Sequence, residues 1–312
     1  MTSRLNSLLR GLFIIHLLSF CGSCAEPHNS QKQNAPREFT EPPSSQKQNA
    51  PREMLALPAP AGWERYPNPA PDSAALQCAN YSRREWRVTL DGHGVKIDLD
   101  TLGNHQEPLP SNIHSKSVAV GTKGTRHIAQ VDDGSLISLD VGEFGGGLWW
   151  FSSDGQSSRK LSDENVLGFA ETASGILAIG GLAHIGSDYG HVLLVGAGAG
   201  GNRRIETLST LNAAPMAFVI ESPDSILVLT TRELVRVRGD GTQQHLLPVN
   251  YGLLYPNSMT LGLAGILHVG MRHFVTRLTP MGDRYKEEWF VPVGCLRFSI
   301  KDYDCVCQPN RK

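Results

Sequence analysis

The residues best suited to chemistry lie close together in the segment Gly180–His191, which reads GGLAHIGSDYGH. It carries His184, Asp188, Tyr189 and His191. Imidazole and carboxylate groups are common metal ligands and hydrogen-bond partners, so this group could hold a metal ion or a polar ligand. The alternative is an extended loop with ordinary polar residues. Because long loops on a rigid scaffold often carry binding residues, we expect the ligand-binding residues here.

Other patterns that could indicate a reaction are absent or have a simpler explanation. The sequence contains no Gly-x-Ser-x-Gly motif and no recognisable Ser-His-Asp arrangement. The apolar run His191–Val195 enters the glycine-rich segment Gly196–Gly201, which could form a phosphate-binding loop. A dinucleotide site requires a helix directly after the glycines. The segment Asn202–Leu208 instead aligns with a strand of the repeats described below, so we predict a hairpin turn.

Two adjacent tryptophans lie in the segment Phe144–Phe151, which reads FGGGLWWF. Neighbouring residues of a strand point to opposite faces, so one of Trp149 and Trp150 should pack in the core and the other on the opposite face. An exposed tryptophan could stack on a sugar or a peptide. We therefore include Trp149 among the candidate ligand-binding residues, with core packing as the alternative for both rings.

Cysteine spacing indicates an oxidising compartment. Beyond the N-terminal region the cysteines form an even set, namely Cys78, Cys295, Cys305 and Cys307. Four such cysteines favour two disulfides, for which three pairings exist. A Cys305–Cys307 bridge would be strained, so we favour Cys78 joined to one C-terminal cysteine and a second bridge within the C-terminal segment. Zinc binding by Cys305 and Cys307 is the alternative, although neither histidines nor the usual two-residue spacing accompany them.

The N-terminus has the order of a secretory signal over residues 1–24. Arg4 and Arg10 precede the apolar run Gly11–Phe20, and small residues follow. We expect export, either with simple cleavage near Cys24 or with Cys24 lipidated as a membrane anchor. In a bacterium this would place the protein in the periplasm or on the outer membrane; otherwise it would be secreted. A buried N-terminal helix is the weaker alternative.

Residues 25–62 have the composition of a spacer. The nine residues SQKQNAPRE occur at Ser30–Glu38 and again at Ser45–Glu53. Such Gln-, Pro- and Ser-rich sequence has little to bury, so we expect a disordered or extended segment that holds the folded part away from a membrane. A peptide ligand for a partner is the alternative.

The charge balance excludes some partners. Lys and Arg number 29 and Asp and Glu number 30, which gives a formal net charge of −1. No basic surface is expected, so nucleic acid is not an expected partner. No apolar run reaches the roughly 18–20 residues of a membrane-spanning helix. Membrane association would therefore depend on the lipid anchor.

Residues 63–312 contain a repeat of about 40 residues, the length of a propeller blade. Four segments align: Gly134–Gly142, Gly175–Ala183, Ser225–Glu233 and Gly265–His273; their starts are 41, 50 and 40 residues apart. Six positions before each start lies an apolar residue: Ile128, Phe169, Val219 and Met259. Two further strands follow in each unit, the first of them apolar, with Asp-Gly turns at Asp154–Gly155 and Asp240–Gly241. Four antiparallel strands at this period predict an all-β fold, a β-propeller of four-stranded antiparallel blades. A β-sandwich is the alternative.

Closure of the ring should involve both chain ends. Trp86–Leu99 reads as a hairpin before the four clear units, and Cys295–Ile300 as a lone strand after them. A propeller must join its first and last blades, since it otherwise leaves open strand edges. We therefore expect five blades closed by N- and C-terminal strands, or six if Ile113–Val120 begins another.

The segment Tyr255–Gly270, YPNSMTLGLAGILHVG, resembles the blade pattern of NHL-repeat and gluconolactonase-like (regucalcin-like) propellers. The resemblance covers residues 128 to 290 and concerns the fold. It implies that Asn257 matches a metal ligand of those enzymes, although Ser258 replaces the usual glycine and partner ligands are not identified. The alternative is a turn asparagine that satisfies backbone groups.

These observations favour a non-catalytic, exported and lipid-anchored or secreted propeller that binds a protein or a glycan on one face of the ring, without a cofactor. The alternative is a metal-dependent hydrolase or lyase of the gluconolactonase-like kind, which would require a divalent metal near Asn257.

Overall fold

The computed structural model describes residues 57–92, 94–100, 107–113, 124–198 and 202–308. The expected signal, Cys24 and nearly all of the expected spacer lie outside the described residues, as does most of Ile113–Val120. Among the described residues, no helix has the length and hydrophobicity needed to cross a membrane. The described part is β-sheet apart from the helix α1 (Ala74–Asn80) and short 3-10 turns.

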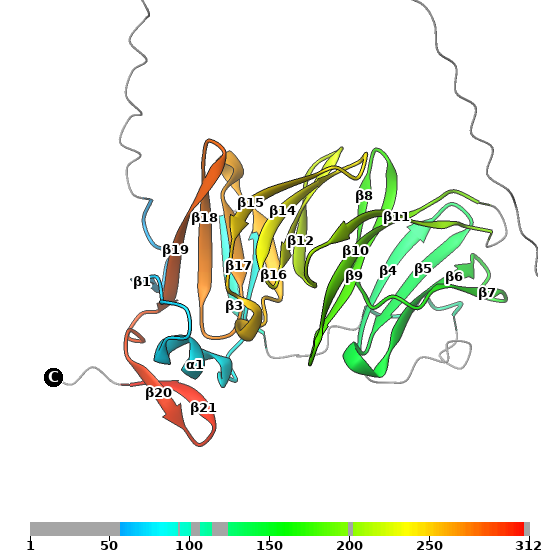
Figure 1. Ribbon diagram of the computed structural model, residues 1–312. Coiled ribbons are helices and arrows are strands. Elements are labelled where there is room, and N and C mark those ends of the chain that lie inside the picture. Colours follow the sequence, from blue (N-terminus) through cyan, green and yellow to red (C-terminus); the bar gives the residue numbers. More distant parts are fainter. Residues whose placement is uncertain (1–56, 93, 101–106, 114–123, 199–201, 309–312) are drawn as a thin grey trace, which may run out of the picture. The chain divides into compact units, whose positions relative to one another are not determined.

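Four antiparallel sheets follow one another along the chain, each built from consecutive strands (Figure 1). The first contains β4 (Thr125–Val131), β5 (Gly134–Asp140), β6 (Gly146–Ser152) and β7 (Ser158–Ser162). The second contains β8 (Val166–Thr172), β9 (Gly175–His184), β10 (Ser187–Val195) and β11 (Ile205–Leu211). The third contains β12 (Pro215–Ser222), β13 (Ser225–Thr230), β14 (Glu233–Arg238) and β15 (Gln243–Pro248). The fourth contains β16 (Ser258–Leu261), β17 (Leu267–Gly270), β18 (Val275–Met281) and β19 (Arg284–Pro292).

The burial of individual strands explains why these residues form blades. Strand β13, SILVLT, has all six residues buried, as expected for a strand with a neighbour on each side and a sheet against each face. Gly134, which opens β5, has φ 152°, and a Cβ there would lie 1.8 Å from the Phe151 carbonyl oxygen. Glycine is therefore required where this hairpin turns tightly.

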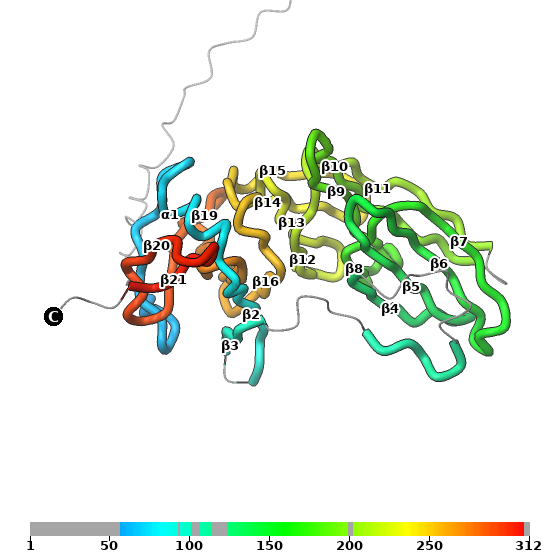
Figure 2. Tube along the Cα trace, turned by 90° about the horizontal axis from the view of Figure 1, so that it is seen from below, coloured from blue at the N-terminus to red at the C-terminus, as the bar shows by residue number. Residues whose placement is uncertain are grey.

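Hydrophobic clusters fill the spaces between successive sheets. One joins the first and second sheets through Leu136, Leu148, Ala178 and Leu193. Another joins the second and third sheets through Leu177, Ile179, Ile226 and Val228, and a third joins the third and fourth sheets. The sheets follow one another in chain order (Figure 2). Four-stranded sheets packed face to face in this way are the blades of a β-propeller, which confirms the predicted fold class.

The N-terminal strand β1 (Trp63–Tyr66) closes the fourth sheet. It pairs antiparallel with β19, which gives the order β1-β19-β18-β17-β16. The sheet therefore joins the start of the propeller to its last repeat, as closure requires. The two-stranded hairpin of β2 (Trp86–Asp91) and β3 (Gly94–Leu99) forms the next sheet, and β2 contacts β16 and β17.

The C-terminal segment differs from the prediction. Cys295–Ile300 is not a lone strand in a blade: β20 (Phe298–Lys301) pairs with β21 (Asp304–Cys307) in a separate hairpin that contacts α1. Two disulfides hold this hairpin, Cys78–Cys305 to α1 and Cys295–Cys307 within the segment. One bridge therefore joins Cys78 to a C-terminal cysteine and the other lies within the C-terminal segment, the pattern favoured from the sequence.

The glycine-rich segment after His191–Val195 connects two antiparallel strands. Val195 of β10 pairs with Ile205 of β11, so a strand and not a helix follows the glycines. Gly200 and Gly201 lie outside the described residues. The hairpin interpretation is confirmed for the flanking strands, which pair antiparallel, whereas a dinucleotide site would require a helix in place of β11.

Candidate functional site

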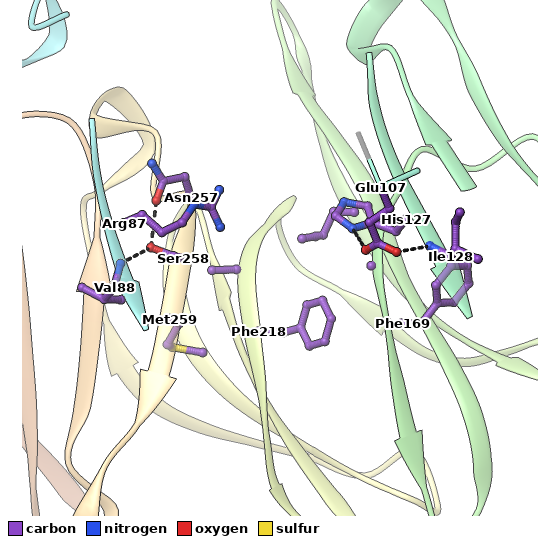
Figure 3. Close-up of a pocket in the computed structure, with 13 residues that line it drawn as sticks. Arg87, Val88, Glu107, His127, Ile128, Phe169, Phe218, Asn257, Ser258 and Met259 are labelled. Atoms are coloured by element: carbon purple, nitrogen blue, oxygen red, sulfur yellow. Dashed lines mark hydrogen bonds and ion pairs between the residues drawn. The ribbon is translucent and has the colours of Figure 1, made fainter. Parts of the chain in front are cut away.

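A pocket of about 300 Å³ lies where the inner strands of five sheets meet (Figure 3). Strands β2, β4, β8, β12 and β16 all contribute side chains to its wall. Inner strands surround the axis of a propeller, so this axial pocket is the central channel of the fold. Its lining combines charged and other polar side chains with large apolar ones.

The charged residues of the pocket come from β2, β4 and the connections beside them, whereas the polar Asn257 and Ser258 lie at the start of β16. Arg87 donates from Nε and Nη2 to Asp100 Oδ2, at 3.2 and 3.1 Å. His127 Nδ1 lies 3.4 Å from Glu107 Oε1, while Glu107 Oε2 accepts from the Ile128 backbone N–H at 3.0 Å. These carboxylates are therefore engaged by neighbouring groups and fix the positions of Arg87 and His127.

The large apolar side chains of the axial pocket are Phe169, Phe218 and Met259, and Gly168 lines the pocket with them. A Cβ on Gly168 would lie 2.7 Å from the Phe218 ring, so the glycine makes room for that ring. The pocket thus combines an apolar wall with a few polar groups, the composition typical of small-ligand sites.

Asn257, the predicted metal residue, lines this pocket directly before β16. Its Oδ1 accepts from the Ser258 hydroxyl at 2.8 Å, and its backbone N–H donates to the Gly270 carbonyl at 3.0 Å. Its Nδ2 is buried and has no hydrogen-bond partner among the described residues. Both N–H donors of the side-chain amide are therefore unpaired within the described residues.

The axial pocket shares Arg87, His127 and Asn257 with a second space, the channel mouth, whose lining also includes Glu85 and Asp100. A larger groove of about 680 Å³ adjoins the channel mouth. Its walls are the β9–β10 hairpin tip, the segment Ala214–Met216 and the segment Gly252–Tyr255. Asp140 and Met216 line both the groove and the channel mouth, so the two spaces share a border. Three of its residues are exposed apolar side chains: Ile185 at 91%, Leu253 at 55% and Tyr255 at 45%.

The segment predicted to carry the site forms a hairpin and not a loop. Strands β9 and β10 extend to His184 and Ser187, which pair with each other across a two-residue turn. Asp188 of this hairpin accepts from the Ala214 N–H at 2.8 Å, the Thr231 hydroxyl at 2.9 Å and Arg232 Nε at 2.8 Å. Asp188 therefore fastens the hairpin to the next blade.

The remaining predicted residues also have partners within the chain. His184 Nε2 pairs with Glu143 Oε2, and His191 Nδ1 lies 3.3 Å from Glu164 Oε1. The Tyr189 and His191 rings are 5.8 Å apart, and burial together with Glu164 raises the pKa of Tyr189. His184 and Asp188 line the groove, whereas Tyr189 and His191 are not among its wall residues. In the part of the chain described, no three His, Cys, Asp or Glu residues gather at metal-binding distance.

Trp149 and Trp150 occupy opposite faces of β6. Trp150 is 4% exposed, packs against the second sheet and donates from Nε1 to Asp133 Oδ1 at 3.1 Å. Trp149 is half-buried beside Ile137 and Phe151, with the Lys160 ammonium 5.1 Å from its ring centre. Trp149 lines neither the axial pocket nor the groove.

Sequence reasoning missed Arg87, Glu107 and His127. The signal for His127 was present: it precedes Ile128 in the aligned first strands, and the equivalent residues Gly168, Phe218 and Ser258 also line the pocket. The position directly before the aligned apolar residue therefore lines the channel in all four repeats. Arg87 and Glu107 lie outside the four aligned units, so the repeat carried no signal for them.

The comparisons with known proteins are distant. No family model and no curated protein matches the sequence. Among solved structures, a streptogramin B lyase structure has 15% identity and a TM-score of 0.37 and covers 57% of this chain and 65% of that one. The extracellular domain assigned to a hybrid two-component system of B. thetaiotaomicron has 9% identity and a TM-score of 0.31. That match covers 73% of this chain and 39% of the other. The chain spans less than two thirds of either structure.

Proposed function

We propose that this protein is an exported, non-catalytic β-propeller that binds a protein or a glycan partner through the groove beside the channel mouth. Its two disulfides indicate an oxidising, non-cytoplasmic compartment. In a bacterium the expected location is the periplasm or, with Cys24 lipidated, the outer membrane. In another host the protein would be secreted.

The observation that carries the proposal is the apolar border of the groove. Ile185 at the hairpin tip is 91% exposed, and Leu253 and Tyr255 are exposed across the same groove. Large apolar side chains that gather beside a concave surface mark interaction sites more often than scattered ones do. A partner that covered them would remove apolar area from water, worth about 25 cal/mol per Å² before the costs of association.

The polar residues of the groove support binding over catalysis. Asp188 is committed to Ala214, Thr231 and Arg232, and His184 to Glu143. A general base must lie within hydrogen-bond reach of the proton that it removes, and these groups are already used to hold the hairpin. They give the groove a rigid wall.

The test is a screen of the purified, disulfide-bonded protein against a glycan array and against a displayed library of random dodecapeptides. The variant Ile185→Ser with Leu253→Ser should lose binding to whichever ligand the wild type selects. Leu263→Ser is the matched control: Leu263 is 92% exposed and lies at the opposite end of β16 from Asn257. Equal binding by wild type and groove variant would overturn the proposal.

A metal-dependent hydrolase or lyase of the gluconolactonase-like kind is the second candidate, favoured by the position of Asn257 in the axial pocket with His127 and Glu107. The donor set fits a metal poorly, because Asn257 Oδ1 accepts from Ser258 and Glu107 is engaged by Ile128 and His127. Metal analysis of protein purified without a histidine tag separates the candidates. A stoichiometric divalent ion that is lost in Asn257→Ala would favour the enzyme.

A further inference from the structure

We infer that the partner in the groove is a peptide segment of another protein that carries apolar side chains and a Lys or Arg. This inference rests on the proposed function and goes further by naming the partner's chemistry. It follows from three features of the groove. These are the charge at its border with the channel mouth, its exposed apolar residues, and the hydrogen bonds that its polar groups already make within the protein.

Carboxylates dominate the described lining of the groove and the channel mouth. These residues include four carboxylates, Glu85, Asp100, Asp140 and Asp188, but Arg87 is their only Lys or Arg. Three of the four carboxylates have an arginine partner: Arg272 binds Glu85, Arg87 binds Asp100 and Arg232 binds Asp188. Three of these negative charges are therefore balanced within the protein, and the attraction of the lining for a cation rests on the fourth carboxylate, Asp140.

Asp140 is the exception among these carboxylates. Its Oδ1 accepts from the Gly142 N–H at 2.8 Å, and within the described residues no cationic side chain pairs with it. It lies on the border shared by the groove and the channel mouth. A Lys or Arg side chain of a partner that reached this border would supply the missing charge, in a partly enclosed place where ion pairs are less screened by water.

The exposed apolar residues line the same groove as this carboxylate and belong to two separate segments. Ile185 tops the β9–β10 hairpin, and Leu253 and Tyr255 belong to the segment that leads into β16. The Arg272 guanidinium lies over the Tyr255 ring, 3.9 Å from the ring centre, in a cation–π contact that positions the ring. Asp188 fastens the hairpin to the next blade, so both walls are in place before a partner arrives, which lowers the entropy cost of binding.

A glycan fits these features less well than a peptide. Sugar recognition needs free hydrogen-bonding side chains, because a polar group without a bond in the complex costs affinity. Here Asp188 and His184 are bonded within the protein. An unpaired carboxylate beside aliphatic side chains is instead complementary to a basic residue flanked by apolar ones.

The test uses the same random dodecapeptide library, with Asp140→Asn as the decisive variant. Asn keeps an oxygen that can accept from the Gly142 N–H, so the loop is preserved while the charge is removed. Peptides selected by the wild type should be enriched in Lys or Arg together with apolar residues. By fluorescence anisotropy at low salt, their affinity should fall about tenfold in Asp140→Asn and in Ile185→Ser, and remain unchanged in Leu263→Ser. The loss in Asp140→Asn should shrink at high salt.

The possible failures are distinguishable. Selected peptides without an excess of basic residues, or equal affinity for wild type and Asp140→Asn, would overturn this inference. So would a glycan that binds the wild type but not Ile185→Ser with Leu253→Ser, although that result would support the proposed function. If no peptide or glycan binding depends on the groove residues, both the inference and the proposed function fail.

Discussion

At the scale of single residues, Asp188, a predicted ligand-binding residue, lines the groove and also links two blades. Its carboxylate is only 23% exposed and accepts bonds from a backbone N–H, a hydroxyl and a guanidinium of the next blade. In the sequence Asp188 lies between His184 and His191, but this spacing cannot show that each histidine pairs with its own glutamate. Those partners, Glu143 and Glu164, lie 41 and 27 residues away.

Asp188→Ala should destabilise the protein. The change leaves the Ala214 N–H and the Thr231 hydroxyl without their acceptor, which costs about 1–3 kcal/mol of the free energy of unfolding. Asp163→Ala is the control, since Asp163 is 92% exposed and pairs only with Lys160 in the described structure; its effect should stay within about 0.5 kcal/mol. Urea unfolding measures both. A variant Asp188→Ala as stable as Asp163→Ala would refute the structural role.

Two buried histidines make stability depend on pH. Burial, with the charge of Arg277, lowers the pKa of His268 to about 4, and burial with Arg84 does the same for His273. The unfolded rings take up protons near pH 6.5 and the folded rings only near pH 4. The contribution of the two neutral rings to the free energy of unfolding is therefore fully present above pH 6.5. It is lost as the pH falls toward 4, at about 1.4 kcal/mol per pH unit for each ring.

His273→Asn tests this dependence. His273 has φ 65°, a left-handed conformation that asparagine tolerates better than most residues. Between pH 7.5 and pH 5 the wild type should lose about 2 kcal/mol more unfolding free energy than the variant, because only the wild type has this ring to protonate. Denaturant unfolding at the two pH values gives the comparison. Parallel losses in the two proteins would show that His273 does not carry the effect.

At the scale of elements, the two disulfides should differ in their contribution to stability. Cys78–Cys305 joins residues 227 positions apart, whereas Cys295–Cys307 spans 12. The entropy of loop closure predicts a loss of about 5 kcal/mol for the first and about 3 kcal/mol for the second when both cysteines become serine. Thermal unfolding of the two double variants, Cys78→Ser with Cys305→Ser and Cys295→Ser with Cys307→Ser, tests the order. A larger loss for the short bridge would contradict it.

The elements also show what the sequence could predict. The four repeated sheets were predictable, because apolar strands and turn glycines recur at about 40 residues. The C-terminal hairpin was missed because its turn residues, Asp302 and Tyr303, both have positive φ where Gly or Asn is usual. The register of the β1–β19 pairing was not predictable, since the paired residues are 223 to 229 positions apart and nothing local specifies them. The groove likewise depends on such long-range packing.

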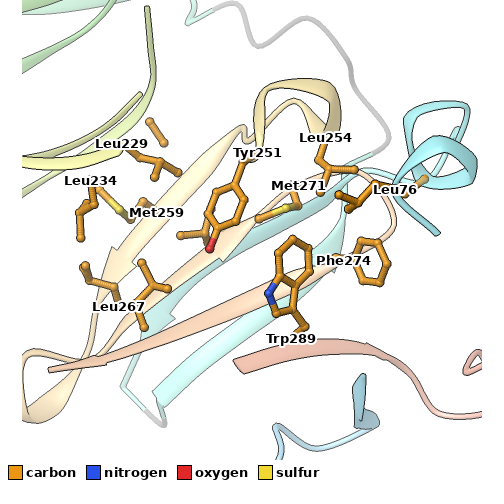
Figure 4. Close-up of a cluster of buried hydrophobic side chains, with 14 of the residues drawn as sticks. Leu76, Leu229, Leu234, Tyr251, Leu254, Met259, Leu267, Met271, Phe274 and Trp289 are labelled. Carbon is orange, nitrogen blue, oxygen red and sulfur yellow. The ribbon is translucent and has the colours of Figure 1, made fainter. Parts of the chain in front are cut away.

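At the scale of the whole molecule, the propeller turns a local repeat into one shared site. Leu229 and Leu234 of the third sheet pack in one cluster with Met259 and Leu267 of the fourth (Figure 4). This packing between blades holds the inner strands around the channel and places the connecting segments beside its mouth. Residues from three sheets can therefore form one groove, although they are far apart in the chain.

The most direct test of this account is hydrogen–deuterium exchange of the protein with and without its tightest selected ligand. The account predicts slower exchange on binding in the segments Gly181–Asp188 and Gly252–Tyr255, which form two walls of the groove. The turn Leu263–Gly265, at the opposite end of β16, should exchange as in the free protein. Protection confined to that turn or to the β1–β19 edge, with none in the groove segments, would contradict the proposal that this groove is the binding site.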